Sequence, residues 1–267
     1  MGGTDSTEGY LLDNARPEAG ERFAAFAELF DLATFAHIQA LGIRSGWHCW
    51  EVGAGSAAVP TWLADHVGAT GQVLATDLDL SWLAADAPFQ TRVHDVGADP
   101  APDRLFDLVH ARLVLVHVPA RDQALATMVS ALEPGGWLFV EDADPALQPL
   151  LCLDEFGPEQ ELANRIRRGF RTLMAGRGAD LAFGRTLPRR LRDAGLIDIR
   201  ADAYFPVTSP ACAVLEAATV RQIRDQLVQA DLATDAEIDL HLANVASGRL
   251  DLSTAPMICA AGRKPLA

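Results

Sequence analysis

An alternation of short apolar runs with helical stretches between residues 47 and 141 limits the folds open to this chain. The five runs of strand length are predicted at 47–52, 72–76, 90–96, 105–110 and 137–141. The stretches whose apolar residues recur at helical spacing are predicted at 59–67, 80–85 and 121–132. Strands that alternate with helices in this way form a parallel sheet with helices on both faces. The sequence therefore predicts an α/β fold.

The segments on either side of this region follow other patterns. Before residue 46, apolar residues such as Phe23, Phe26 and Phe30 recur at helical spacing. After residue 144 we expect helices near 162–173, 186–194 and 211–245, and strands at 196–207 and 256–261. The expected organisation is an N-terminal helical arm over 1–45 and an α/β domain over 46–267, with helical insertions at about 145–180 and 210–250. Such insertions belong at the carboxyl ends of the strands, where ligands of open α/β sheets bind.

The composition of the chain argues against several classes of partner. A formal net charge of −14 repels a phosphate backbone, so we expect no nucleic-acid partner. No run approaches the roughly 20 apolar residues of a bilayer span, and the N-terminus lacks the features of a secretory signal. We expect a cytoplasmic monomer or homodimer with no membrane partner. The cysteines lie too far apart in sequence to suggest a metal knuckle or a disulfide framework: Cys49, Cys152, Cys212 and Cys259.

Arginine is concentrated in one part of the chain. Ten of the 22 basic residues lie between Arg165 and Arg200, a window with only three acidic residues. This local excess of positive charge could hold an anionic substrate. Arginines on a solvated helix face explain it equally well, so the composition leaves both interpretations open.

A glycine-rich turn and a following acidic residue predict a ligand site. The turn, Glu51-Val52-Gly53-Ala54-Gly55-Ser56-Ala57, follows a predicted strand and precedes a predicted helix. Glycine lets the backbone turn sharply and approach a ligand without a Cβ in the way. Asp77 lies 22 residues beyond Gly55, at the end of the second strand, where a carboxylate can accept hydrogen bonds from both ribose hydroxyls. The pair predicts a nucleoside-containing ligand.

Other nucleotide-binding classes fit this turn poorly. It lacks the third glycine of G-x-G-x-x-G and any G-K-[ST] sequence, and the whole chain has one lysine, Lys264. The missing phosphate-binding lysine excludes P-loop nucleotide hydrolysis. An NAD-dependent oxidoreductase is disfavoured because the glycine turn is short and the chain has no Tyr-x-x-x-Lys pair.

Five landmarks in residues 49–142, about a third of the chain, together carry a family resemblance. They read EVGAGSA, VLATDLD, VHDV, FDLVHARLVLVHVP and LEPGGWLFVED. In order and spacing they resemble the class I S-adenosylmethionine-dependent methyltransferases of small-molecule type. The resemblance implies a Rossmann-like, seven-stranded, mostly parallel sheet with helices on both faces and helical lid insertions. The family's turn usually reads E/D-x-G-x-G-x-G, and Ala57 replaces its last glycine here.

The resemblance also implies which residues bind S-adenosylmethionine. In the turn these are Glu51, Gly53, Ala54 and Gly55, and the two glycines would let the backbone lie against the methionine part of the cofactor. In the family an acid at the end of the second strand binds the ribose, and the residue at that position here is Asp77.

The adenine and the amino end of the cofactor have their own implied contacts. Leu78 would pack on adenine, Asp95 would accept from its exocyclic amine, and the Val96 amide would donate to its ring. Ala111 and Arg112 would present backbone groups to the amino end. In related enzymes an N-terminal arm closes over the cofactor carboxylate, a role open to Tyr10 and Arg22 here, although an exposed Arg22 is the simpler expectation.

The chemistry of methyl transfer needs few catalytic side chains. Direct displacement at a sulfonium removes the positive charge of the sulfur, so the enzyme mainly has to align the reacting atoms. A phenol, amine or carboxylate acceptor therefore needs no base, while an alcohol or carbon acid does. His117, a few residues after the fourth strand, is the candidate base, or else a hydrogen-bonded histidine at a helix start. Glu141 and Asp142 could orient a substrate hydroxyl, or serve solubility at a strand end. Metal-dependent members of the family need a cluster of Asp or Asn ligands near the ends of the fourth and fifth strands. Asp142 and Asp144 have no third partner there, so we expect no metal.

Two functions remain open. The first is a methyltransferase that moves a methyl group to O, N or C of a small organic acceptor, a secondary metabolite, by direct displacement. The second is a non-methylating S-adenosylmethionine-binding protein on the same fold. Labelled cofactor offered with a panel of metabolites separates them.

Overall fold

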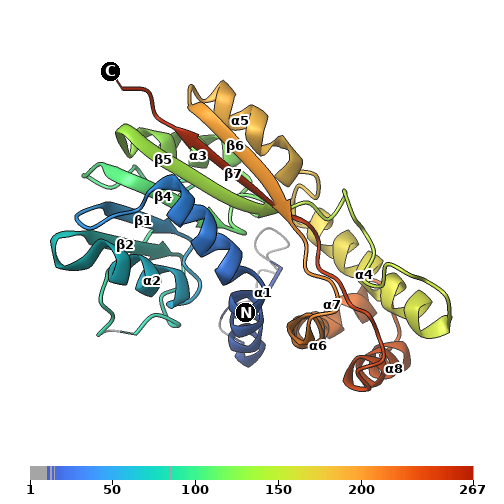
Figure 1. Ribbon diagram of the computed structural model, residues 1–267. Coiled ribbons are helices and arrows are strands. Elements are labelled where there is room, and N and C mark those ends of the chain that lie inside the picture. Colours follow the sequence, from blue (N-terminus) through green and yellow to red (C-terminus); the bar gives the residue numbers. More distant parts are fainter. Residues whose placement is uncertain (1–10, 13, 15, 85, 267) are drawn as a thin grey trace, which may run out of the picture. The chain divides into compact units, whose positions relative to one another are not determined.

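The computed structural model describes residues 11, 12, 14, 16–84 and 86–266. Within these residues the sheet has seven strands in the order β3-β2-β1-β4-β5-β7-β6 (Figure 1). The strands are β1 (His48–Val52), β2 (Gln72–Asp77), β3 (Gln90–Val93), β4 (Phe106–Arg112), β5 (Leu132–Ala143), β6 (Ile197–Tyr204) and β7 (Met257–Arg263). Neighbours from β3 to β5 pair in parallel, and β7 is antiparallel to both β5 and β6. The predicted seven-stranded, mostly parallel sheet is confirmed.

The helices alternate with the strands and then accumulate in the last third of the chain. They are α1 (Pro17–Leu41), α2 (Ala58–Val67), α3 (Arg121–Ser130), α4 (Pro158–Gly176), α5 (Leu187–Asp193), α6 (Pro210–Gln222), α7 (Arg224–Gln229) and α8 (Asp235–Ala246). The start of α8 has a capping box, in which Thr234 accepts from the Glu237 amide and Glu237 accepts from the Thr234 amide. Ser209 caps α6, and Pro210 occupies the first helical position, where no amide hydrogen is needed.

The described chain divides into two compact units. Residues 30–144, 182–204 and those from 257 onward form the unit that holds the sheet, called the sheet unit below. The described residues up to 29, with 145–181 and 205–256, form the helical unit. The residues of α1 are divided between the two.

An apolar core of the sheet unit packs against α3 and α5. Successive strand side chains point to opposite faces, so Trp50 and Val52, Val109 and Ala111, and Ile258 and Ala260 share the face that packs there. The intervening residues, including Glu51, His110, Glu141 and Cys259, point to the other face. The strands therefore separate an apolar face from one with polar groups.

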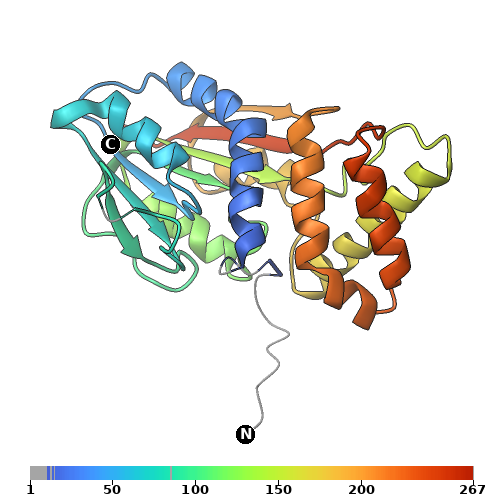
Figure 2. The same ribbon diagram turned by 90° about the horizontal axis from the view of Figure 1, so that it is seen from below.

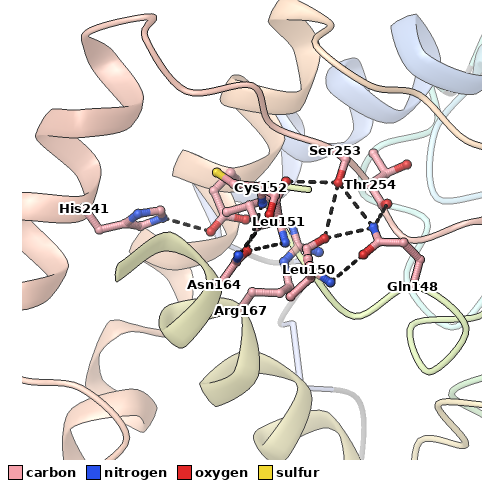
Figure 3. A network of polar contacts seen from close by, with 10 residues as sticks. Gln148, Leu150, Leu151, Cys152, Asn164, Arg167, His241, Ser253 and Thr254 are labelled. Carbon is pink, nitrogen blue, oxygen red and sulfur yellow. Dashed lines mark hydrogen bonds and ion pairs between the residues drawn. The ribbon is translucent and has the colours of Figure 1, made fainter. Parts of the chain in front are cut away.

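The helical unit has its own core, built by α4, α6, α7 and α8. Its buried members include Leu162, Ile166, Val220 and Ile238. Figure 2 shows α6 and α8 side by side. Asn164 anchors the segment before α4, since it accepts from the amides of Leu151 and Cys152 and donates to the Cys152 carbonyl (Figure 3).

One predicted helix is wrong. The described residues 80–84, expected to be helical, form turns and bends. Asp77 accepts from the Asp79 amide and Asp79 accepts from the Ser81 amide, so acidic side chains satisfy the backbone locally in place of a helix.

The start of β5 also differs from the sequence prediction. The predicted helix 121–132 ends at Ser130, and β5 begins at Leu132 and continues through Pro134, Gly135 and Gly136. A Cβ at Gly136 would lie 2.8 Å from the Phe106 carbonyl oxygen, so only glycine lets β5 approach β4 here.

Among the described residues, no helix combines the length and apolar character needed to cross a bilayer.

Candidate functional site

The turn after β1 depends on its glycines for two reasons. Gly53 and Gly55 have φ angles of +64° and +58°, in the left-handed region that favours glycine. A Cβ on Gly53 would also overlap the side chain of Val114, which follows β4. The Ala54 amide donates to the Thr76 carbonyl at 2.9 Å. The turn is thereby fixed at the carboxyl ends of β1, β2 and β4.

Ala57 replaces the last glycine of the family pattern without backbone strain. Its φ of −78° and ψ of −6° are open to any residue. It precedes α2 and makes no side-chain cap, so it leaves the first amides of that helix without a side-chain acceptor from this position.

Asp77 meets the glycine turn directly. Its Oδ2 accepts from the Gly55 amide at 2.8 Å, and its Oδ1 accepts from the Asp79 amide at 3.2 Å. A carboxylate offers about four acceptor positions, so each oxygen retains capacity for a further donor. Leu78, the next residue, is 67% exposed. The glycine turn and the acid, predicted from separate motifs, lie within one hydrogen bond of each other.

Asp95 and Val96 follow β3 at the same edge of the sheet. Val93 pairs with Asp77, which places Asp95 two residues beyond that level. Asp95 is exposed and its Oδ1 accepts from the Gly97 amide at 2.8 Å. Val96 is 5% exposed and belongs to the core of the sheet unit.

The side chain of Arg112 is bound by residues of α1. Its guanidinium donates to Thr34 at 2.9 Å and to Asp31 at 2.8 Å, both on α1. Ala111 is buried, and the next residue after Arg112, Leu113, has a φ of +59° while its amide donates to the Glu141 carbonyl. These bonds fix the chain at the end of β4, where backbone groups were predicted to serve the ligand.

A buried network lies under the turn. Glu51 pairs with His110 in the β1·β4 register, and its Oε2 lies 2.6 Å from His110 Nδ1. His110 Nε2 lies 3.1 Å from Glu141 Oε2, which also accepts from the Thr34 hydroxyl at 2.6 Å. Burial alone would lower the pKa of His110, but the two carboxylates outweigh it and raise the pKa to about 9. His110 is a buried core histidine whose two ring nitrogens both have carboxylate partners.

The two carboxylates of this network differ in charge preference. Burial raises the pKa of Glu51. It would also raise the pKa of Glu141, but the hydrogen bond and charge of His110 lower it overall. Glu51 is 2% exposed and its carboxylate contacts buried His110. Its contact with a cofactor stays a prediction.

The turn between β4 and α3 carries His117. This histidine is half-buried, and its amide donates to the Val114 carbonyl at 3.0 Å. Asp142 holds the same turn, because its carboxylate accepts from the Val116 amide at 3.0 Å. Burial raises the pKa of Asp142 to about 7. The sequence missed this positioning role because Asp142 and Val116 meet only through the folded sheet.

Glu141 and Asp142 do not have the arrangement first expected of them. Both are at most 1% exposed and both accept hydrogen bonds from protein groups, so neither side chain faces solvent as a substrate-orienting acid would. Asp144 is likewise buried, and Arg185 binds it through two nitrogens, at 2.6 and 2.5 Å.

Half of the ten arginines in the arginine-rich window are paired with acids in the structure. Five of its arginines form ion pairs: Arg165 with Glu237, Arg167 with Glu216, Arg185 with Asp144, Arg189 with Asp193 and Arg190 with Asp122. For these residues the excess of positive charge in the sequence does not persist in space.

The N-terminal arm corrects one expectation. Arg22, expected to be exposed, is 1% exposed and donates to the Gln222 side chain at 3.1 Å within the helical unit. An arginine on an amphipathic helix can be buried when a side-chain amide accepts its hydrogen bond. The spacing of apolar residues does not reveal such a partner. Tyr10 lies outside the described residues.

The central strands are similar to those of a known protein family. Residues 50–140 match a family described as "Methyltransferase domain". The ubiquinone/menaquinone biosynthesis C-methyltransferase UbiE of Pseudoalteromonas translucida is 31% identical over 116 residues, 39% of this chain and 45% of that protein. Methyltransferase str3 of Strobilurus tenacellus is 32% identical over 153 residues, 55% of this chain and 52% of that protein. The chain thus spans about half the length of these curated relatives.

Solved structures share the fold at low sequence identity. A phosphoethanolamine N-methyltransferase 2 of Haemonchus contortus superposes with a TM-score of 0.56 at 16% identity, covering 93% of this chain and 58% of that one. The YcgJ protein of Bacillus subtilis gives a TM-score of 0.57 at 11% identity, covering 89% of this chain and 100% of that one. At these identities the likeness concerns the fold alone.

Proposed function

From the premise that residues 50–140 form a class I methyltransferase domain, we propose that this chain transfers a methyl group from S-adenosylmethionine to a small organic acceptor. The observation that carries the proposal is the 2.8 Å hydrogen bond from the Gly55 amide to Asp77. It brings a glycine turn with open backbone and a carboxylate with spare acceptor capacity to one place, at the carboxyl ends of parallel strands.

The residues around this bond suit the parts of the cofactor. Asp77 would accept from the ribose hydroxyls while it retains the Gly55 amide. Leu78 offers an exposed apolar side chain to adenine, with Asp95 and Val96 at the same edge. The backbone of Gly53, Ala111 and Arg112 would face the methionine part.

When bound, S-adenosylmethionine supplies an activated methyl group. Held by the backbone of Gly53, Ala111 and Arg112 and by Asp77, it would supply this methyl group to the acceptor atom by direct displacement, with loss of the sulfonium charge. The chain has to align the acceptor and exclude water, which requires no acid or base for a phenol, amine or carboxylate. His117 would take the proton of an alcohol or carbon acid.

The choice of acceptor, which we propose is a secondary metabolite, would rest with the segments that leave the sheet. The 145–180 insertion follows β5 and the 210–250 insertion follows β6.

Calorimetry with S-adenosylmethionine tests the cofactor site. Asp77→Ala removes hydrogen bonds to a charged acceptor, each worth about 1.5–3 kcal/mol, so we expect affinity to fall at least about 100-fold. Asp79→Ala is the matched control, because Asp79 caps the neighbouring Ser81 amide, and it should bind like the wild type. Equal affinity of Asp77→Ala and the wild type would refute the site.

Methyl transfer needs a separate experiment. Methyl-labelled cofactor is offered with phenols, amines, carboxylates and alcohols, and label in a product of the panel supports the enzyme. Tight binding without transfer to any acceptor supports the non-methylating alternative. His117→Gln should reduce transfer to an alcohol by about 10²–10⁴-fold and leave transfer to an amine or phenol nearly unchanged.

A further inference from the structure

The polar face of the sheet unit brings together three side chains that the proposed methyl transfer does not use. We propose that His37, Glu141 and Cys259 form a binding site for one divalent transition-metal ion of the zinc type. The three come from α1, β5 and β7, and nothing in the methyltransferase chemistry requires them. The inference is independent of the proposed function.

The geometry of the cluster is fixed by the sheet. Glu141 and Cys259 are direct partners in the β5·β7 register, and Cys259 Sγ lies 3.2 Å from Glu141 Oε1. The ligand atoms of His37, Glu141 and Cys259 all lie within 4.8 Å of one another. Over the described part of the chain, this is the one group of three such side chains at that spacing.

The histidine is oriented by a fourth residue. His37 Nε2 lies 2.8 Å from Asp202 Oδ2, and Asp202 is the β6 partner of Cys259. His37 Nδ1 is buried and has no hydrogen-bond partner among the described residues. In the tautomer with the proton on Nε2, donated to Asp202, the Nδ1 lone pair is open to a metal ion. A carboxylate that orients a histidine in this way is the usual support of a zinc-bound imidazole.

The ligand set selects the class of metal. One thiol, one imidazole and one carboxylate suit zinc, whereas magnesium and calcium prefer oxygen ligands alone. Zinc binds sulfur at about 2.3 Å and nitrogen or oxygen at about 2.0 Å, which places tetrahedral ligands roughly 3.5 Å apart. The sulfur and oxygen already have nearly this separation. A water molecule would complete the fourth position.

An ion can reach the cluster from one side. Cys259 and Glu141 are buried, but the side chains of His37 and Asp202 are 29% and 60% exposed. On binding, the Cys259 thiol releases its proton to solvent and a sulfur–metal bond forms. Glu141 Oε1 exchanges the thiol hydrogen for the metal, while Oε2 keeps its bonds to Thr34 and His110. No electron changes hands.

A metal at this position would clamp α1 to the sheet. Glu141 would be shared between the ion and His110, and His110 bonds Glu51 two residues before Gly53. A bound metal would therefore rigidify the residues that support the glycine turn. In this proposal His37, Glu141 and Cys259 are the metal ligands and Asp202 is a positioning residue.

Zinc binding to the full chain tests the proposal. The metal-free protein is titrated with zinc in competition with a chromophoric chelator, and with cobalt to observe the thiolate-to-metal charge-transfer band. The wild type should bind one ion with that band. Cys259→Ser should lose the band, and His37→Ala should lose tight binding. Asp202→Asn should weaken affinity about 10–100-fold, the usual effect of losing a supporting carboxylate.

The controls separate metal binding from folding. Cys49→Ser alters another buried thiol of the sheet, on β1, and should bind zinc like the wild type. His37 and Asp202 are partly exposed, so circular dichroism should show that their variants are folded. A wild type that takes up no stoichiometric zinc, or a Cys259→Ser variant that keeps the cobalt band, would overturn the proposal.

Discussion

Each of the two units buries a histidine beside a carboxylate, but with opposite arrangements. In the sheet unit His110 is the centre, with Glu51 and Glu141 on its two ring nitrogens. In the helical unit Glu216 is the centre, bound by Arg167 at 3.0 Å and by His241 at 2.9 Å. The first network joins strand ends under the glycine turn, and the second joins α4, α6 and α8.

The difference lies in how each network can respond to a lost partner. A carboxylate left alone in an interior can take up a proton and become neutral, whereas an arginine cannot lose its charge. In the sheet network His110 and its two direct partners, Glu51 and Glu141, all titrate. In the helical network Arg167, a permanent cation, is paired with Glu216.

The largest effect is expected in the helical unit. Glu216→Ala leaves the Arg167 guanidinium, 16% exposed, without its acid, and we expect the free energy of unfolding to fall by about 3–5 kcal/mol. Denaturant unfolding measures this. Asp239→Ala, which removes an acid from a surface pair with Arg224, is the control and should change little. Similar losses in both variants would contradict the comparison.

A smaller effect is expected in the sheet unit. His110→Ala leaves Glu51 and Glu141 without their shared partner, at a cost of about 2 kcal/mol at neutral pH. The raised pKa of His110, about 9 against its usual 6.5, makes the difference from the wild type grow as the pH falls from 9 to 6.5. Below that range the two carboxylates of the variant can be protonated, so the difference should shrink as the pH falls further. Unfolding curves at several pH values show this, and a loss that stays constant or grows below pH 6.5 would count against it.

Backbone geometry at the glycine turn should give a more modest effect. Gly53→Ala places a Cβ at a φ of +64° against Val114, and we expect a loss of about 1–2 kcal/mol, together with weaker S-adenosylmethionine binding. Ala57→Gly, where φ is −78°, is the matched control and should bind nearly like the wild type. Equal affinities for the two variants would show that the turn tolerates a side chain.

The smallest effect is the acid dependence of the helical network. Burial alone would raise the pKa of Glu216, but the charge of Arg167 and the hydrogen bond from His241 lower it below its usual 4.5. Its stabilisation is therefore complete above about pH 4.5 and is lost as the pH falls through the lower folded-state pKa. Acid unfolding of the wild type should be steeper than that of Glu216→Gln, and parallel curves would contradict the direction.

Local sequence was sufficient for the glycine turn and Asp77. Strand, turn and helix follow each other there, and parallel topology brings successive strand ends to one edge, so the meeting of Gly55 and Asp77 needs no further information. The five parallel strands follow from the same alternation, whereas the seven-stranded sheet was implied by the family resemblance. Residues 80–84 were mistaken for a helix because apolar spacing does not register acidic side chains that bond backbone amides.

The remaining contacts depend on tertiary structure. Asp31, Thr34 and His37 are spaced along one face of α1, but nothing in that spacing names Arg112 or Glu141 as their partners. The burial of Arg22 against Gln222, 200 residues away, is equally invisible to periodicity. Side chains that support a site from a distant segment have no local signal.

Arg112 serves two purposes with different parts of the same residue. Its guanidinium holds Asp31 and Thr34, while its main chain ends β4 at the proposed cofactor site. A ligand that immobilises the main chain of Arg112 would therefore also stabilise the part of α1 that carries Asp31 and Thr34. Slower amide deuterium uptake around Asp31 would then report occupancy from a distance, without any label at the binding position itself.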